Sequence, residues 1–190
     1  MLHTLVATVE NKPGVLNRVA SLLRRRNFNI SSLTVGETEN PAISRMTIVV
    51  DTATTKPHIV SANLYKLVNV IEVRDITTHH RVERDLALLK VRADATSRPE
   101  IMQFTELYRA KIVAVAHDAL VLEVTGTPQE VEAFIEIIQP FGLLEITRTG
   151  VVAMQYGTDD PAMRQPTAAA TNGTKKSAQY VQPLAEREGV

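Results

Sequence analysis

Along most of the chain, segments with the apolar pattern of a strand alternate with segments that have the apolar spacing of a helix. The order of these segments predicts the fold. Short runs rich in Val, Ile, Leu and Thr are typical of strands, whereas apolar residues spaced three and four apart predict amphipathic helices. In the first half, strands are expected at 2–10, 28–35, 43–50 and 70–76. Two helices are expected from the stripes Val15, Leu16, Val19, Leu22, Leu23 and Val60, Leu64, Leu67, Val68. The predicted order is βαββαβ.

The same order of elements recurs in the second half. Strands are expected at 85–93, 111–116, 119–125 and 143–149. The helical stripes are Ile101, Phe104, Leu107, Tyr108 and Val131, Phe134, Ile135, Ile138. Ser97 with Glu100, and Thr127 with Glu130, have the spacing of a capping box at a helix start. The repeat is one of secondary structure, since the residues themselves differ.

The pattern therefore predicts an α+β protein of two ferredoxin-like βαββαβ domains, with antiparallel sheets and the helices on one face. We expect a first domain at 1–78, a linker at 79–83, a second domain at 84–156 and a flexible tail at 157–190. The uncovered face of the first sheet is expected to carry Leu2, Val6 and Ile48 among polar residues. Such a face, or the edge of the sheet, favours oligomerisation.

Composition narrows the classes of partner. There is no cysteine, and 21 basic residues balance 21 acidic residues, so there is no bulk charge to attract nucleic acid or anionic lipid. An RNA-recognition domain has the same element order, but these strands lack its aromatic pattern. No apolar run approaches the ~20 residues of a membrane helix. Without a signal-peptide pattern, a cytoplasmic protein is expected.

Candidate chemistry lies between the first strand and the first helix. Asn11 offers a carboxamide, Gly14 allows close approach to its amide, and a helix amino end suits a carboxylate. Asn29 can hydrogen-bond an amino or carboxylate group, and Ile30 can give an apolar wall. Together they fit a small zwitterion with an aliphatic side chain. The alternative is structural, with Pro13-Gly14 as a turn and Asn11 as a cap.

Other motifs point away from catalysis and metal binding. His79-His80 has no third ligand at a convincing spacing, so an exposed linker is the simpler interpretation. There is no phosphate-binding glycine loop and no pattern of a nucleophile with its base. Arg24, Arg25 and Arg26 form either a solvated helix end or a contact for an acidic partner surface. A non-catalytic chain without a metal site is expected.

Several segments together resemble the small subunit of acetolactate synthase (acetohydroxyacid synthase). In the first half these are Asn11-Lys12-Pro13-Gly14-Val15-Leu16, Phe28-Asn29-Ile30-Ser31-Ser32-Leu33-Thr34-Val35 and Ile43-Ser44-Arg45-Met46-Thr47-Ile48-Val49-Val50. In the second half they are Ala87-Leu88-Leu89-Lys90-Val91, Arg98-Pro99-Glu100-Ile101, Phe104, Val121-Leu122-Glu123-Val124-Thr125-Gly126-Thr127-Pro128 and Pro140-Phe141-Gly142. The resemblance covers roughly residues 1–155 and leaves the tail unassigned.

This resemblance implies an ACT domain that pairs with a second copy and binds a branched-chain amino acid, usually valine, at the interface. The implied effector-binding residues are Asn11, Gly14, Val15, Leu16, Asn29 and Ile30. It also implies a regulatory subunit that activates a separate catalytic subunit and makes it inhibitable. Thiamine diphosphate, magnesium and FAD would belong to that subunit, with no cofactor bound by this chain. The alternative is a free-standing ACT-type amino-acid sensor that regulates another enzyme.

Overall fold

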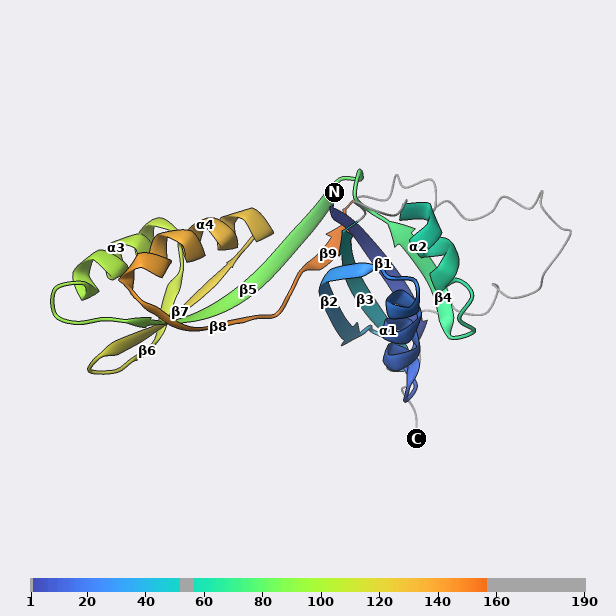
Figure 1. Ribbon diagram of the computed structural model, residues 1–190, viewed down its shortest axis with the longest axis horizontal. Coiled ribbons are helices and arrows are strands. Elements are labelled where there is room, and N and C mark those ends of the chain that lie inside the picture. Colours follow the sequence, from blue (N-terminus) through green and yellow to red (C-terminus); the bar gives the residue numbers. More distant parts are fainter. Residues whose placement is uncertain (1, 52–56, 157–190) are drawn as a thin grey trace, which may run out of the picture. The chain divides into compact units, whose positions relative to one another are not determined.

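The computed structural model describes residues 2–51 and 57–156, which form two antiparallel sheets with their helices (Figure 1). The first sheet and its helices comprise β1 (Leu2–Glu10), α1 (Val15–Arg25), β2 (Asn29–Glu37), β3 (Ile43–Asp51), α2 (Pro57–Leu64) and β4 (Val70–Asp75). The second set comprises β5 (Arg81–Arg92), α3 (Arg98–Leu107), β6 (Lys111–Val115), β7 (Ala119–Gly126), α4 (Pro128–Ile138), a 3-10 turn at Gln139–Phe141, β8 (Leu143–Arg148) and β9 (Val152–Gln155). The predicted class, two ferredoxin-like α+β domains, is confirmed.

The first sheet has the strand order β2-β3-β1-β4, so β2 and β4 are its edges. Val15, Val19 and Leu23 bring one side of α1 onto the sheet, in a core that includes Leu5 and Ile48. The expectation that Ile48 lies on the uncovered face is wrong. Ile48 pairs with Leu5, and strand alternation turns both side chains toward the helices.

The second sheet has the order β6-β7-β5-β8, and α3 and α4 cover one of its faces (Figure 1). Its core gathers the alternate residues Ala87, Leu89 and Val91 of β5 around Phe134 of α4. Phe134 is fully buried, and its ring lies 5.4 Å from the ring of Tyr108. The helical stripe predicted for 131–138 therefore faces the sheet.

One of the two predicted capping boxes forms and the other does not. At α4, the Thr127 hydroxyl accepts from the Glu130 amide, and the Glu130 carboxylate accepts from the Thr127 amide. At α3, Ser97 makes no cap bond to Glu100. Asp94 replaces it, accepting from the amides of Thr96 and Ser97 and from both hydroxyls. The Ser97 hydroxyl donates to Asp94 and accepts from the Asp94 amide in place of the Glu100 amide.

The Asp94 turn gives α3 an acid-sensitive start. Hydrogen bonds from Thr96 and Ser97 hold the pKa of the Asp94 carboxyl far below its usual range. A depressed pKa in the folded state stabilises the fold above the unfolded value of about 3.9, and this contribution is lost as the pH falls through the lower folded value. We expect Asp94→Asn to be less stable than the parent at pH 7, with the difference shrinking below about pH 4. Urea unfolding between pH 7 and pH 3 measures it, and a gap that widens on acidification would contradict it.

Strand β9 was not predicted from the sequence. It pairs with the first part of β5, with Arg81 opposite Gln155 and Arg84 opposite Val152. Consequently β5 begins inside the segment expected to be a linker at 79–83. Val151 and Ala153 are buried together with Val6 and Val49, on the side of the first sheet opposite its helices. The face expected to be uncovered is thus partly covered by the chain itself.

The remaining sequence expectations concern the tail and the membrane. The flexible tail predicted at 157–190 lies outside the described residues. Within the described ranges, no helix has both the length and the apolar character needed to cross a bilayer.

Candidate functional site

The loop between β1 and α1 ends at Gly14, the residue that precedes the helix. Gly14 has φ +83°, in the left-handed region that favours glycine, and a Cβ added to it would meet no atom within 4 Å. It provides no side-chain cap to α1. The sequence prediction that glycine opens the backbone to close approach at this position is consistent with this geometry.

The first turn of α1 offers amide groups that the helix itself does not use. The Val15 amide donates to the Lys12 carbonyl, and the Arg18 amide starts the helical ladder on the Gly14 carbonyl. The amides of Leu16 and Asn17 lie between them, among the first-turn donors that an α-helix leaves free. This turn contains no acidic residue. The helix end is therefore suited to a carboxylate.

Val15 and Leu16 occupy different environments. The Val15 side chain is buried in the core and its amide donates to the Lys12 carbonyl, so neither group is offered to a ligand. Leu16 is 45% exposed and presents an apolar side chain beside the free amides. The two predicted site residues thus differ in what they can contribute.

Asn11 ties the loop to the far end of β2. Its amide nitrogen donates to Glu37 Oε1 at 3.2 Å and to the Pro41 carbonyl at 2.9 Å. The Asn11 main-chain amide donates to the Ala42 carbonyl at 2.7 Å. Asn11 is therefore no cap of α1, and it fixes the loop against the β2–β3 connection.

A polar network that sequence reasoning missed holds the other side of the loop. Asn69 donates to Glu10 Oε2 at 2.6 Å and accepts from Arg18 at 2.6 Å. The hydrogen bonds from Asn69 and then Lys12 lower the pKa of the Glu10 carboxyl. These residues are 59 and 51 positions apart in sequence, so no local motif signals the network.

Asn29 and Ile30 open β2, at the other end of the sheet. Asn29 is exposed and pairs with Asp51 of β3, whereas Ile30 packs against the core. The pairing register shifts between Ile30 and Ser32, which is a β-bulge. A bulge bends its strand and re-aims the neighbouring side chains.

One chain does not bring the two halves of the predicted site together. Asn29 lies opposite Asp51, which pairs with Leu2 at the start of β1, whereas Asn11 follows Glu10 at the end of β1. The eight steps from Leu2 to Glu10 correspond to about 27 Å at the usual strand rise. The Asn11–Leu16 group and the Asn29–Ile30 pair can share a ligand only between two copies of the chain.

The described residues show no constellation for metal binding. Residues 2–51 and 57–156 contain no group of three or more His, Cys, Asp or Glu side chains that could hold a metal ion. His79 and His80 are exposed, and the His80 ring lies 5.9 Å from that of Tyr156.

Two family models match, one on each half of the chain. Residues 5–72 match the acetohydroxyacid synthase small subunit-like ACT domain. Residues 84–157 match the model described as the small subunit of acetolactate synthase. The first match contains the β1–α1 loop and the start of β2 described above.

Individual relatives agree with these matches. The acetolactate synthase small subunit of Mycolicibacterium smegmatis is 48% identical over 82% of this chain and 91% of its own length. The probable acetolactate synthase small subunit of Archaeoglobus fulgidus is 49% identical over 83% and 98%. The crystal structure of the acetolactate synthase small subunit from Thermotoga maritima superposes with a TM-score of 0.76, at 42% identity over 83% of this chain and 98% of that one. From these similarities, the chain belongs to the family of acetolactate synthase small subunits.

Proposed function

We propose that this chain is the regulatory subunit of an acetolactate synthase, without catalytic activity of its own. It would activate a separate catalytic subunit and make that subunit inhibitable by valine, or by leucine or isoleucine. The family membership supports this role. The separation of the two site halves within one chain supports an effector site that forms between two copies.

The proposed effector site forms between two copies that pair through β2. This strand is an edge of the first sheet, nine residues long and without proline, so its outer side is free to pair with another strand. In an antiparallel pair centred on Leu33, Asn29 of one copy lies opposite Glu37 of the other. Asn11 contacts Glu37 in its own chain. The pairing thus brings the start of one β2 to the β1–α1 loop of the second copy.

The chemistry of the two halves fits an aliphatic amino acid. The free amides at the start of α1 suit its carboxylate, and Asn29 offers hydrogen bonds to its charged groups. Leu16 and Ile30 offer apolar contact to its side chain. Thiamine diphosphate, magnesium and FAD would be held by the catalytic subunit, which performs the condensation of pyruvate.

The decisive test is acetolactate formation by the cognate catalytic subunit, titrated with this chain, with and without valine. We expect activity to rise with added chain until the catalytic subunit is saturated, and valine then to lower it. Leucine and isoleucine, tested at the same concentrations, establish the preferred effector. The catalytic subunit alone with valine is the control, and we expect its activity to stay unchanged.

Two other outcomes would change the assignment. Association without any effect of the three amino acids would remove feedback from the proposal and leave activation. No association and no change of activity would contradict the regulatory-subunit proposal. A free-standing amino-acid sensor that regulates another enzyme would then be the better explanation.

A further inference from the structure

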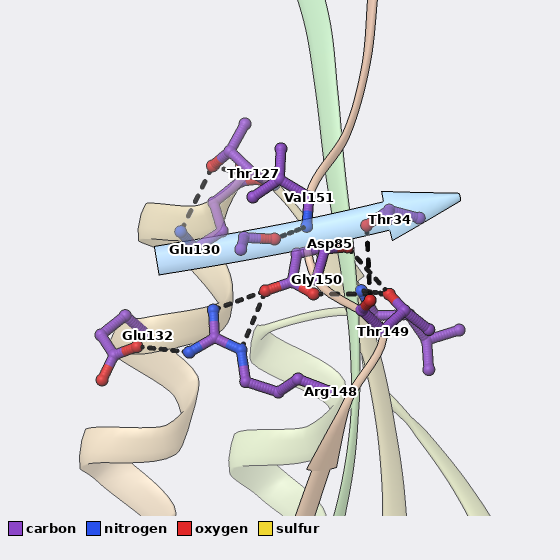
Figure 2. Close-up of polar contacts among 11 residues, drawn as sticks. Thr34, Asp85, Thr127, Glu130, Glu132, Arg148, Thr149, Gly150 and Val151 are labelled. Carbon is purple, nitrogen blue, oxygen red and sulfur yellow. Dashed lines mark hydrogen bonds and ion pairs between the residues drawn. The ribbon is translucent and has the colours of Figure 1, made fainter. Parts of the chain in front are cut away.

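The strand that begins with Asn29 and Ile30 also contacts the connection between β8 and β9 (Figure 2). The Val151 amide donates to the Ser32 hydroxyl at 2.9 Å. The Thr34 hydroxyl lies 3.5 Å from the Thr149 carbonyl, at the limit of a hydrogen bond. Residues 148–151, here called the junction segment, are therefore held against β2 two to four positions after Ile30.

Gly150 makes this contact unusually close. Its φ is +84°, and a Cβ at this position would lie 2.6 Å from the Ser32 hydroxyl oxygen and 3.2 Å from that of Thr34. A side chain at this position would have to displace the Ser32 hydroxyl, which accepts from Val151. The hydrogen bond from Val151 to Ser32 therefore needs glycine at position 150, and a shift of β2 would move the junction segment or break this bond.

The other side of the junction segment is fixed to the second sheet and its helix (Figure 2). The Arg148 guanidinium binds Asp85 on β5, with Nε 2.9 Å from Oδ2, and Glu132 on α4 at 2.8 Å. The Asp85 side chain is only 1% exposed. Burial alone would lower the pKa of Arg148, but hydrogen bonds to Asp85 and Glu132 outweigh it and raise the pKa. Arg148 therefore stays protonated at neutral pH.

Main-chain bonds reinforce this anchor. The Thr149 amide donates to the Leu86 carbonyl at 3.0 Å, and the Leu86 amide donates to the Thr149 hydroxyl at 3.2 Å. The junction segment thus has β2 on one side and β5 with α4 on the other. Hydrogen bonds thus connect the segment to both sides.

Among the strands of the first sheet, β2 is the one that bears the predicted effector residues Asn29 and Ile30 and also contacts the junction segment. The central strands β1 and β3 also contact the second half, through Thr4 with Glu83 and through Arg45 with the Ala153 carbonyl. Each of them has a strand on both sides, whereas β2 pairs with β3 alone within the chain. A ligand at the start of β2 therefore acts directly on the strand that holds the junction segment.

We propose that the junction segment transmits effector occupancy at the start of β2 to the second domain, through the Ser32–Val151 hydrogen bond and the Gly150 contact. This proposal rests on the proposed function, because it requires an effector at Asn29 and Ile30. Ser32 and Gly150 are positioning residues that touch no ligand. Allosteric coupling requires that the effector favour one of two arrangements, and coupling factors are typically about 5–150-fold.

Two variants interrupt the link in different ways, and each has a matched control. Ser32→Ala removes the hydroxyl that accepts from Val151, whereas Ser31→Ala removes an exposed neighbouring hydroxyl for which the described structure gives no hydrogen bond. Gly150→Ala adds a Cβ that collides with the Ser32 hydroxyl. Gly142→Ala has the same backbone strain, at φ +94°, but its nearest new contact is an ordinary 3.5 Å to Arg92 Cβ.

The experiment compares three readouts on the full chain and on its complex with the catalytic subunit. Calorimetry gives the Kd of valine, the enzyme assay gives the ratio of activities without and with saturating valine, and hydrogen exchange follows the Val151 amide. For Ser32→Ala and Gly150→Ala we expect a Kd within about threefold of the parent, a smaller change than typical coupling factors. We expect activation to be retained and the activity ratio to fall toward 1. In the parent and both controls, valine is expected to slow exchange at Val151 and to inhibit normally.

Each other outcome is informative. If valine binds the parent but both variants are inhibited like the parent, or if valine leaves Val151 exchange unchanged in the parent, the proposed link is overturned while the effector site stands. If the variants lose valine binding itself, the junction segment shapes the site and does not transmit from it, which also overturns the proposal. If valine does not bind the parent, the proposed function fails and this inference fails with it. Ser32→Ala keeps the test valid if Gly150→Ala does not fold.

Discussion

Replacing Gly14 with aspartate is expected to raise the valine concentration for half-inhibition at least tenfold, equivalent to about 1.4 kcal/mol of binding free energy. The new carboxylate would stand beside the free amides of α1 and repel the carboxylate of the effector. Its Cβ meets no atom within 4 Å, and aspartate tolerates a positive φ better than most residues. The fold should therefore survive while the site is blocked.

The measurement is an inhibition curve with the cognate catalytic subunit, and activation in the same assay reports that the subunits still associate. Asn29→His, which puts bulk on the other half of the site, is expected to weaken inhibition in the same direction. Gly142→Asp is the matched control, since it adds the same charge at φ +94° on the other sheet. Parent-like inhibition in both site variants would contradict the proposed effector site.

Phe134→Ala is expected to lower the free energy of unfolding by about 3–5 kcal/mol, the usual cost of removing a fully buried aromatic side chain. Phe134 is fully buried between α4 and the second sheet and packs on the ring of Tyr108. Its loss leaves a cavity that the surrounding strands can fill only in part. Urea unfolding of the full chain measures the change.

Leu107→Ala on α3 gives the comparison for this loss. Leu107 is 73% exposed, so we expect a change within about 0.5 kcal/mol, as is usual for surface substitutions. Similar losses in the two variants would mean that Phe134 does not contribute to the core as its burial indicates. Valine binding by Phe134→Ala, measured below its unfolding midpoint, should resemble that of the parent because the site residues belong to the other sheet.

The order of elements was predictable because the apolar residues repeat with clear periods. Phe134 and its neighbours on α4 show the helical spacing and are buried as expected. Strand β9 was missed because it has four residues and gains its stability from β5 and from the first sheet, which no local period reveals. The Ser97 cap was wrongly predicted because the Ser97 hydroxyl bonds to Asp94, three residues earlier, and not to the start of the helix.

The residues of the site were predictable as two local groups, but their positions relative to each other were not. The Asn11–Leu16 and Asn29–Ile30 segments can each be recognised from their own residues. The structure places them at opposite ends of one sheet. Glu37, Asn69 and Arg18 position the loop through contacts across many residues. Such partners follow from strand register, which the sequence pattern does not specify to the residue.

The bulge at Ser31 determines on which face of the sheet the side chains of β2 lie. Ile30 and Leu33 are three positions apart, an odd number, yet both pack on the helix-covered core. In a regular strand they would face opposite sides. Ser31 is the extra residue that lets Ile30 serve the core while Ser32 and Thr34 face the junction segment. Deleting this one residue would leave Ile30 opposite Val50 and Ser32 opposite Val49 in an unbroken ladder, so each side chain would keep its side. A homologue with a single-residue gap at this position would therefore keep both the apolar wall of Ile30 and the side of the strand that bonds Val151, and would lose only the bend that the bulge gives to the start of β2.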